Sequence, residues 1–152
     1  MIAVIGILAS IAVVSYNGTQ NRTHDAAVRS DLDGAAGLLE SFRTNTSATH
    51  VFPANASDLS TLGVTASKGS YDTTATTNFV YCAGASDGQS FALLGLSKSG
   101  KSFKQTQEKL TDEAFTKTSF GNATTLCSGL GLTLVSSGMS APDTWASWVG
   151  GS

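Results

Sequence analysis

Charged side chains are scarce in this chain of 152 residues. They make up 13% of the sequence, against about a quarter in an average globular protein, and the formal net charge is −2. The few lysines and arginines are scattered, so the chain has no basic stripe for sequence-independent binding of nucleic acid. Thr, Ser, Ala and Gly replace the missing charges, a composition typical of an exported protein with a neutral polar surface rather than of a cytosolic enzyme.

Proline and catalytic residue patterns are also rare. No proline precedes Pro53, so nothing forces a helix in the N-terminal part of the chain to break. His24 and His50 have no visible partners, and no nucleophile stands in a pattern with a base. No His, Cys or acidic residues occur at metal-ligand spacing. We therefore expect no enzymatic activity, no metal and no cofactor.

Cysteine occurs only twice, as Cys82 and Cys127. An even number of cysteines in an exported chain favours a disulfide. Closing the long loop between them would stabilise the fold by about 4 kcal/mol in the chain-entropy model. The alternative is a pair of buried free thiols in a reducing compartment.

Against this polar background, residues 1 to 16 are almost entirely apolar, with Ser10 and Ser15 as the exceptions and no charge. As a helix this segment would span about 24 Å, short of the ~30 Å hydrocarbon core of a bilayer. It is apolar on every side, so it predicts a helix that lies in a membrane or in the core of an assembly. The residues expected to form that surface are Ile2, Val4, Ile5, Gly6, Ile7, Leu8, Ala9, Ile11, Val13 and Val14.

Three other interpretations of the apolar segment compete with this one. A signal peptide would need a basic region before the apolar run, and none is present. A buried core helix would need a larger and less polar partner domain than the remaining chain offers. A simple membrane tether is the strongest rival.

Residues 17 to 45 continue the helix in amphipathic form. Their apolar positions recur at steps of three and four and predict one stripe that packs on a sheet. Gly18 lies at the junction, where it lowers helix propensity by about 1 kcal/mol relative to Ala and marks a possible bend. The stripe consists of Val28, Leu32, Ala35, Leu39 and Phe42.

The rest of the chain predicts a connecting loop and a small antiparallel sheet. Residues 46 to 77, rich in Thr, Ser, Ala and Asn, are expected to form the loop, with one short helical turn at 57–62. Residues 78 to 152 are expected to hold the sheet and a C-terminal region bracketed by the cysteines. Expected strands cover 78–83, 90–97 and 101–107, with turns at 86–88 and 99–100 and a further strand near 132–135. The fold class is α+β, with a long helix, residues 1 to 45, on a sheet of three to four strands.

Two tryptophans, Trp145 and Trp148, lie close together near the end of the chain. Local packing against the sheet is the simpler expectation for their side chains. An exposed patch for adhesion or subunit contact is the alternative.

The sequence at the N-terminus resembles a known family. Residues 6 to 18 read Gly-Ile-Leu-Ala-Ser-Ile-Ala-Val-Val-Ser-Tyr-Asn-Gly, followed by Gln20-Asn21-Arg22, Asp25-Ala26-Ala27-Val28 and Ser30-Asp31-Leu32. This pattern resembles the N-terminal helix of type IV pilins and pseudopilins, in particular those of Gram-positive and related bacteria. The resemblance in sequence covers residues 1 to 42. Beyond residue 42 it rests on the expected architecture: a helix, then a small antiparallel sheet, then a cysteine pair that brackets the C-terminal region.

The resemblance implies a ladle-shaped α+β subunit whose N-terminal helix anchors it in the membrane and later packs in the core of a helical filament. Two features depart from the family pattern. The methylated Phe and the Glu that normally open the mature pilin helix have no counterpart, because the first acidic residue is Asp25. We expect them upstream of Met1, so they are assigned to no residue here. Val14 stands where many pilins have a helix-bending Pro.

The function implied by the resemblance is that of a structural subunit, a major pilin of an extracellular type IV pilus. Such filaments serve adhesion to surfaces or host cells, twitching motility and DNA uptake. Expected partners are copies of the same chain, the cytoplasmic membrane before assembly and the pilus assembly machinery, with nucleic acid contacted only indirectly. The alternatives are a minor pilin or secretion-system pseudopilin, and a membrane-tethered monomeric adhesin or binding module.

Overall fold

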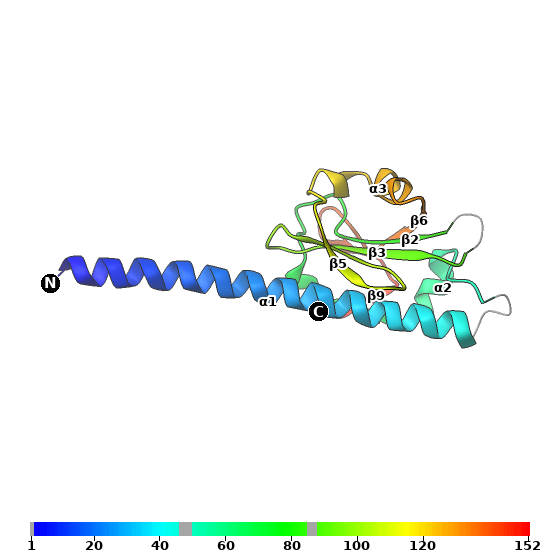
Figure 1. Cartoon of the computed structure of the whole chain (residues 1–152), viewed down its shortest axis with the longest axis horizontal. Helices are drawn as coiled ribbons and strands as arrows, with labels where there is room; N and C mark the ends of the chain where they lie inside the picture. The colour runs from blue at the N-terminus through cyan, green and yellow to red at the C-terminus, as the bar shows by residue number, and fades with distance from the viewer. Residues whose placement is uncertain (1, 46–49, 85–87) are drawn as a thin grey trace.

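The computed structural model describes residues 2–45, 50–84 and 88–152, with side chains in the first helix described from Tyr16 onward. Its dominant element is a single helix, α1 (Ile2–Asn45), that runs without interruption through Gly18. A helix of this length extends over about 66 Å. Figure 1 shows its N-terminal part standing free of the folded body and its C-terminal part lying along it.

A five-stranded antiparallel sheet lies on the C-terminal part of α1, in the order β5-β4-β3-β2-β6. Its strands are β2 (Phe79–Ala83), β3 (Phe91–Leu96), β4 (Ser102–Gln105), β5 (Leu110–Glu113) and β6 (Thr133–Ser137). β2 to β5 form a meander, and β6 returns to pair with the other side of β2. The fold is α+β, as expected, but the sheet has five strands and not three to four.

Short elements surround the sheet. They are α2 (Ala56–Ser60), β1 (Val64–Thr65), η1 (Lys68–Ser70), η2 (Ser119–Gly121), α3 (Ala123–Gly129), β7 (Met139–Ser140), β8 (Thr144–Trp145) and β9 (Val149–Gly150). α2 overlaps the short helical turn expected at 57–62, whereas β1 and η1 fall in the part of the segment 46–77 expected to be a loop. Residues 46–49 and 85–87 lie outside the described residues, so most of the turn expected at 86–88 is not covered. The turn expected at 99–100 is present, with Gly100 at φ +89° and its N–H donating to the Ser97 carbonyl at 2.9 Å.

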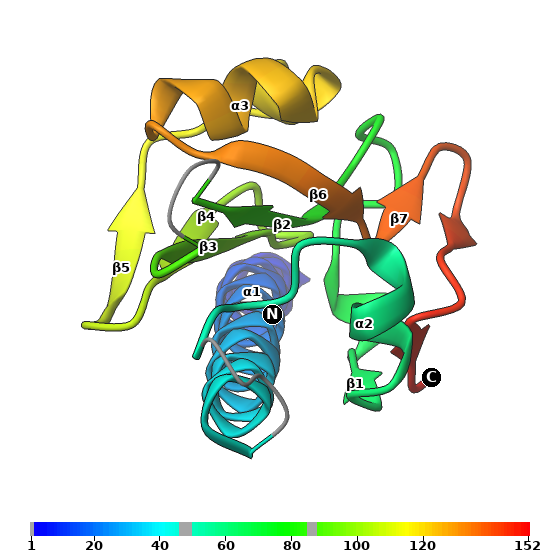
Figure 2. The ribbon, with the colours of Figure 1, turned by 90° about the vertical axis from the view of Figure 1, so that its right-hand side faces the viewer.

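The sheet is buried on both faces, which produces three layers (Figure 2). Phe79, Tyr81 and Leu93 point to the face covered by α1 and belong to one core cluster. Val80 and Leu94 point to the opposite face and belong to a second cluster under α3. Strands buried on both sides are typically continuous apolar runs, which explains the sequences of β2 and β3.

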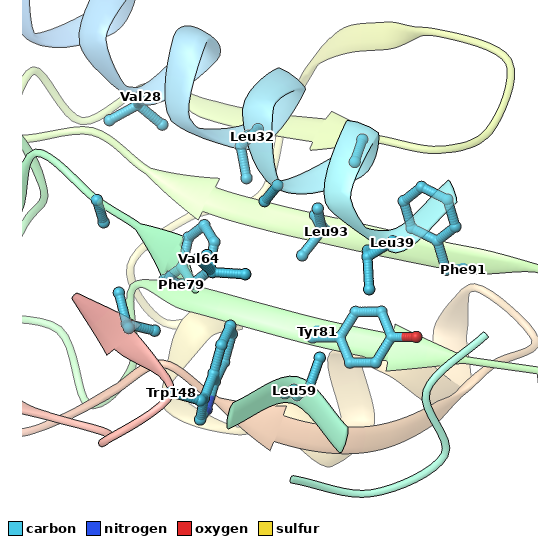
Figure 3. Packing of buried hydrophobic residues seen from close by; sticks show 14 of the residues in the cluster. Val28, Leu32, Leu39, Leu59, Val64, Phe79, Tyr81, Phe91, Leu93 and Trp148 are labelled. Atoms are coloured by element: carbon cyan, nitrogen blue, oxygen red, sulfur yellow. The ribbon is translucent and has the colours of Figure 1, made fainter. Parts of the chain in front are cut away.

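The main core lies between α1 and the sheet (Figure 3). Val28, Leu32 and Leu39 have no exposed surface, and Ala35 is also buried. Phe42, the last member of the expected stripe, is only half-buried. Ala36 is buried as well, so the buried face of α1 is wider there than the regular spacing indicated.

A disulfide joins the middle layer to the outer one, as the cysteine count favoured. Cys82 of β2 and Cys127 of α3 are bonded, with Cα atoms 5.7 Å apart and a sequence separation of 45. Both cysteines are fully buried in the cluster that α3 shares with the sheet. The bond therefore fastens α3 to the second face of the sheet.

The C-terminal tail completes the core on the α1 side. β9 pairs in parallel with β1, in register Val64 to Val149. Trp148 is buried, and its Nε1 donates to Ser136 Oγ at 2.9 Å. Trp145 is half-buried, with its ring edge-to-face on Tyr71 at 5.5 Å between centroids. Local packing therefore describes both tryptophans, and the exposed-patch alternative does not fit Trp148.

Candidate functional site

The projecting part of α1 is the most unusual surface of the molecule. The side chains of residues 16 to 23 are exposed. Tyr16 is the large hydrophobic side chain that stands out, with 65% of its surface exposed. The helix first meets the folded body at His24, whose ring nitrogen lies 3.3 Å from Ser70 Oγ. The ten residues expected to line a filament or membrane surface, Ile2 to Val14, precede the described side chains, although their backbone is helical.

Asp25 fixes the point where α1 meets the sheet. It is buried; Ser99 Oγ donates to its Oδ1 at 2.5 Å, and Lys101 Nζ lies 3.4 Å from its Oδ2. Burial by itself raises the pKa of Asp25, but hydrogen bonds from Ser99, Ser97 and Lys101, together with the Lys101 charge, outweigh it and leave the pKa lowered. Asp25 is therefore an ionised anchor between the helix and the β3–β4 turn.

One turn further along, Arg29 rests on the edge of the sheet. Its guanidinium lies 4.5 Å from the centroid of the Phe103 ring and pairs with the Asp112 carboxylate of β5. Both charged side chains are substantially exposed, so the ion pair itself contributes little to stability. The contact with the Phe103 ring also positions the arginine.

Asp31 forms the third polar contact of α1, on the side facing β1 and η1. Its carboxylate accepts hydrogen bonds from Ser67 N at 2.7 Å and from Ser67 Oγ at 3.2 Å. Burial raises the pKa of Asp31 above its ordinary value despite these hydrogen bonds. The Tyr71 hydroxyl is buried without a hydrogen-bond partner of normal geometry, and burial followed by the nearby Asp31 charge raises the pKa of Tyr71 well above its ordinary value.

Neither Asp31 nor Tyr71 was singled out by sequence reasoning as a functional residue. Asp31 lies outside the apolar stripe, and its position in the sequence is typical of a solvent-exposed acidic residue on a helix. Tyr71 lies in a segment with little periodicity. No signal in the sequence brings the two together, because their contact is created by the folding of η1 against α1.

A surface groove of about 570 Å³ lies where the segment after α3 meets the ends of β3 and β4. Lys104 lines it, but its ammonium is engaged by the Glu113 carboxylate at 2.6 Å. The two histidines lie apart, His24 beside Ser70 and His50 beside the carbonyl of Arg43. Across residues 2–45, 50–84 and 88–152 there is no group of three or more His, Cys, Asp or Glu suited to hold a metal ion. The groove is thus a concave surface whose described lining contains no evident reactive group.

The remaining findings concern membranes and relatives. Within the part of the chain that the structure describes, no helix combines enough length with enough apolar character to cross a membrane. Comparison with family models, with curated proteins and with solved structures gave no match for this chain. The described residues thus form an α+β fold with a long projecting helix.

Proposed function

We propose that this chain is a structural subunit of the type IV pilin kind, which polymerises through its N-terminal helix into an extracellular filament. The observation that carries the proposal is the projection of α1 beyond the folded body (Figure 1). Residues 2 to 24 correspond to about 35 Å of helix before the packed region begins. A helix that projects this far and whose sequence is apolar from residue 1 to 16 is typical of an interaction site, so we infer a partner outside its own folded body.

The sequence of the projecting helix supports assembly with copies of itself. Residues 1 to 16 carry no charge, so neighbouring helices can pack on any side of it. Gly6, Ala9 and Ser10 are small and allow helix axes to approach closely. Before assembly, the same apolar segment would hold the subunit at the cytoplasmic membrane, from which the assembly machinery would deliver it to the filament.

The folded body would form the outer surface of the filament. Its low charge and its disulfide suit an extracellular location. We propose that the chain acts by assembly and not by catalysis. Adhesion, twitching motility or DNA uptake would then be properties of the filament, and DNA would be contacted only indirectly.

Electron microscopy of material sheared from the surface of the producing cells tests this function. Long filaments that label with antibody against this chain are the expected result. Short assemblies confined to the cell envelope would instead indicate a minor pilin or a secretion-system pseudopilin. A detergent-soluble monomer without filaments would indicate a tethered adhesin and contradict the proposal.

Substitution in the helix provides a second line of evidence. Gly6→Phe combined with Ala9→Phe is expected to block filament formation while leaving the cell-associated subunit, because the bulky rings keep helix axes apart. Thr124→Phe, at an exposed position of α3, is the matched control and should leave filaments unchanged. Normal filaments from the double variant would contradict packing through this helix face.

A further inference from the structure

A groove of about 330 Å³ runs along α1 next to β1. It is lined by Ser30, Asp31, Gly34, Ala35, Leu38 and Thr65. Most of these side chains are small, and a Cβ built on Gly34 would meet nothing within 4 Å. The groove is therefore open close to the helix backbone, where another helix could approach.

The groove contains a carboxylate that lacks a cation. Asp25 is paired with Lys101 and Glu40 with Arg43, at 3.4 Å and 2.9 Å, but Asp31 forms no ion pair within the described residues. Lys68, next to Ser67 in sequence, has its ammonium over the Trp145 ring at 5.6 Å from the centroid.

Asp31 also has hydrogen-bonding capacity left. Its two hydrogen bonds from Ser67 use part of a carboxylate's capacity of about four. The Tyr71 hydroxyl, buried on the core side of Asp31, interacts with the same carboxylate and does not line the groove. The groove thus presents acceptors and partly buried negative charge to whatever docks there.

The projecting helix carries the complementary group. Arg22 is the only lysine or arginine in residues 1 to 24, a stretch that contains no acidic residue. Its side chain is exposed and forms no ion pair within the described part of the chain. An arginine guanidinium offers five donors in a planar arrangement, which suits a carboxylate with spare acceptor capacity.

We propose that the groove around Asp31 receives Arg22 from the projecting helix of a second copy of this chain. This inference rests on the filament function proposed above and identifies a contact that sets the register between subunits. Since Asp31 lies nine residues after Arg22, two parallel helices joined in this way are offset by about 13 Å along their axes. Each copy uses its arginine on one neighbour and its groove on another, so the contact is head-to-tail and continues as an open polymer rather than a closed dimer.

Charge reversal in the full chain tests the pairing. Arg22→Asp and Asp31→Arg are each expected to reduce sheared filaments on the order of tenfold or more, because each leaves a partly buried charge opposed by a like charge. The combined variant, with both charges exchanged, is expected to restore most of the filament yield. The measurement is the ratio of sheared filament to cell-associated subunit on quantitative immunoblots.

Asp33 provides the matched control. It also lacks a cation within the described residues, but it is exposed and does not line the groove. Asp33→Arg alone should leave filament yield close to wild type. Combined with Arg22→Asp, it should not restore filaments, which distinguishes a specific pair from a general effect of charge.

A disulfide cross-link between two copies tests the same contact without depending on whether the Asp31→Arg variant folds stably. One helical turn before the pair, the same offset places Gly18 of one copy opposite Ala27 of the next, and these positions are exposed and half-buried, respectively. The described structure has no free cysteine, so Gly18→Cys with Ala27→Cys introduces new reactive thiols and leaves Arg22 and Asp31 in place. Oxidised filaments should show a ladder of covalent multimers, whereas Gly18→Cys with Ser41→Cys should not.

The outcomes separate the two proposals. Wild-type filaments with normal yield from both single charge reversals would overturn the pairing and leave the filament function standing. Loss of filaments in the single variants, without restoration in the double variant and without the ladder, would overturn it too. Absence of wild-type filaments would overturn the filament function and this inference together.

Discussion

Gly95 shows how one residue determines the spacing between α1 and the sheet. It lies in β3 on the face that α1 covers, and a Cβ there would lie 2.8 Å from Val28 Cγ1 and 3.2 Å from Leu32 Cδ1. The absence of a side chain lets the helix lie directly on the strand. Both neighbours are fully buried, so neither has open space into which to move.

Replacing this glycine should loosen the helix. Gly95→Ala is expected to lower the free energy of unfolding by about 1–3 kcal/mol, the usual cost of overpacking a core. Gly37→Ala is the control, because nothing lies within 4 Å of a Cβ at that helical position. It should raise the free energy of unfolding by about 1 kcal/mol. Urea denaturation followed by circular dichroism measures both, and equal effects of the two variants would contradict the close approach.

Asp25 and Asp31 should respond to acid in opposite directions. Because the folded-state pKa of Asp25 is lowered, its contribution to stability is present above the ordinary value of 3.8 and is lost as pH falls through the lowered pKa. Because the pKa of Asp31 is raised, the folded state gains relative stability as pH falls through that raised value.

The pH dependence of unfolding measures these two contributions. Asp25→Asn should reduce the loss of stability on acidification from pH 5 toward pH 3, a window set by these directions and by ordinary Asp pKa values near 4. Asp31→Asn should make that loss steeper, because it removes the opposing gain. Identical pH profiles for both variants and the wild type would contradict the assignment.

At the scale of elements, the C-terminal tail has more influence than its length indicates. β9 contains two residues, yet it pairs with β1 and brings Trp148 into the core beside Phe79, at 5.6 Å between ring centroids. Next to this pairing, Ala66 N donates to Gly150 O at 3.0 Å, and Lys68 N donates to Ser152 O at 3.2 Å. The tail thus fastens β1 and η1, which carry Thr65 and Ser67 next to Asp31.

The two tryptophans allow a direct comparison. Trp148→Ala is expected to destabilise the protein by about 3–5 kcal/mol, because it removes a large buried ring and leaves a cavity. Trp145→Ala should cost about 1 kcal/mol, mainly the edge-to-face contact with Tyr71, since its ring is half-exposed. Thermal unfolding measured by circular dichroism distinguishes them, and equal losses would contradict the different burial of the two rings.

At the scale of the whole molecule, the folded body and the projecting helix are separable. The side chains from Tyr16 to Thr23 are exposed, whereas packing on the sheet begins with Asp25 and Val28. The described core clusters draw on no residue before Val28. The body therefore has the contacts it needs without the N-terminal half of α1.

Removal of residues 1 to 20 should therefore yield a soluble, folded monomer. Size-exclusion chromatography with light scattering should give a single monomeric species, and its urea midpoint should stay close to that of the full chain in detergent. An otherwise identical chain that starts at residue 33 serves as the control and should fail to fold, because it lacks Val28 and Leu32. Aggregation of the first fragment would show that the helix start belongs to the globular core.

The sequence alone determined the features that depend on local patterns. The long helix follows from the missing prolines and the regular stripe from Val28 to Leu39. The strands β2, β3 and β4 follow from apolar or alternating runs separated by glycine turns, and the cysteine count favoured the disulfide. β5 was missed because Leu110–Glu113 is short and polar, with a sheet position decided by pairing to β4.

Only the tertiary structure decided which surfaces are covered and which side chains meet. The burial of both sheet faces depends on α3, whose seven residues carry no strong helix pattern and are fixed by the bond from Cys127 to Cys82. The proximity of Asp31 to Ser67 and Tyr71 depends on η1 folding back on α1, a contact between segments remote in sequence. Local periodicity determines which elements form, whereas the pairing of distant segments determines where a partly buried charge such as Asp31 remains without a cation among the described residues.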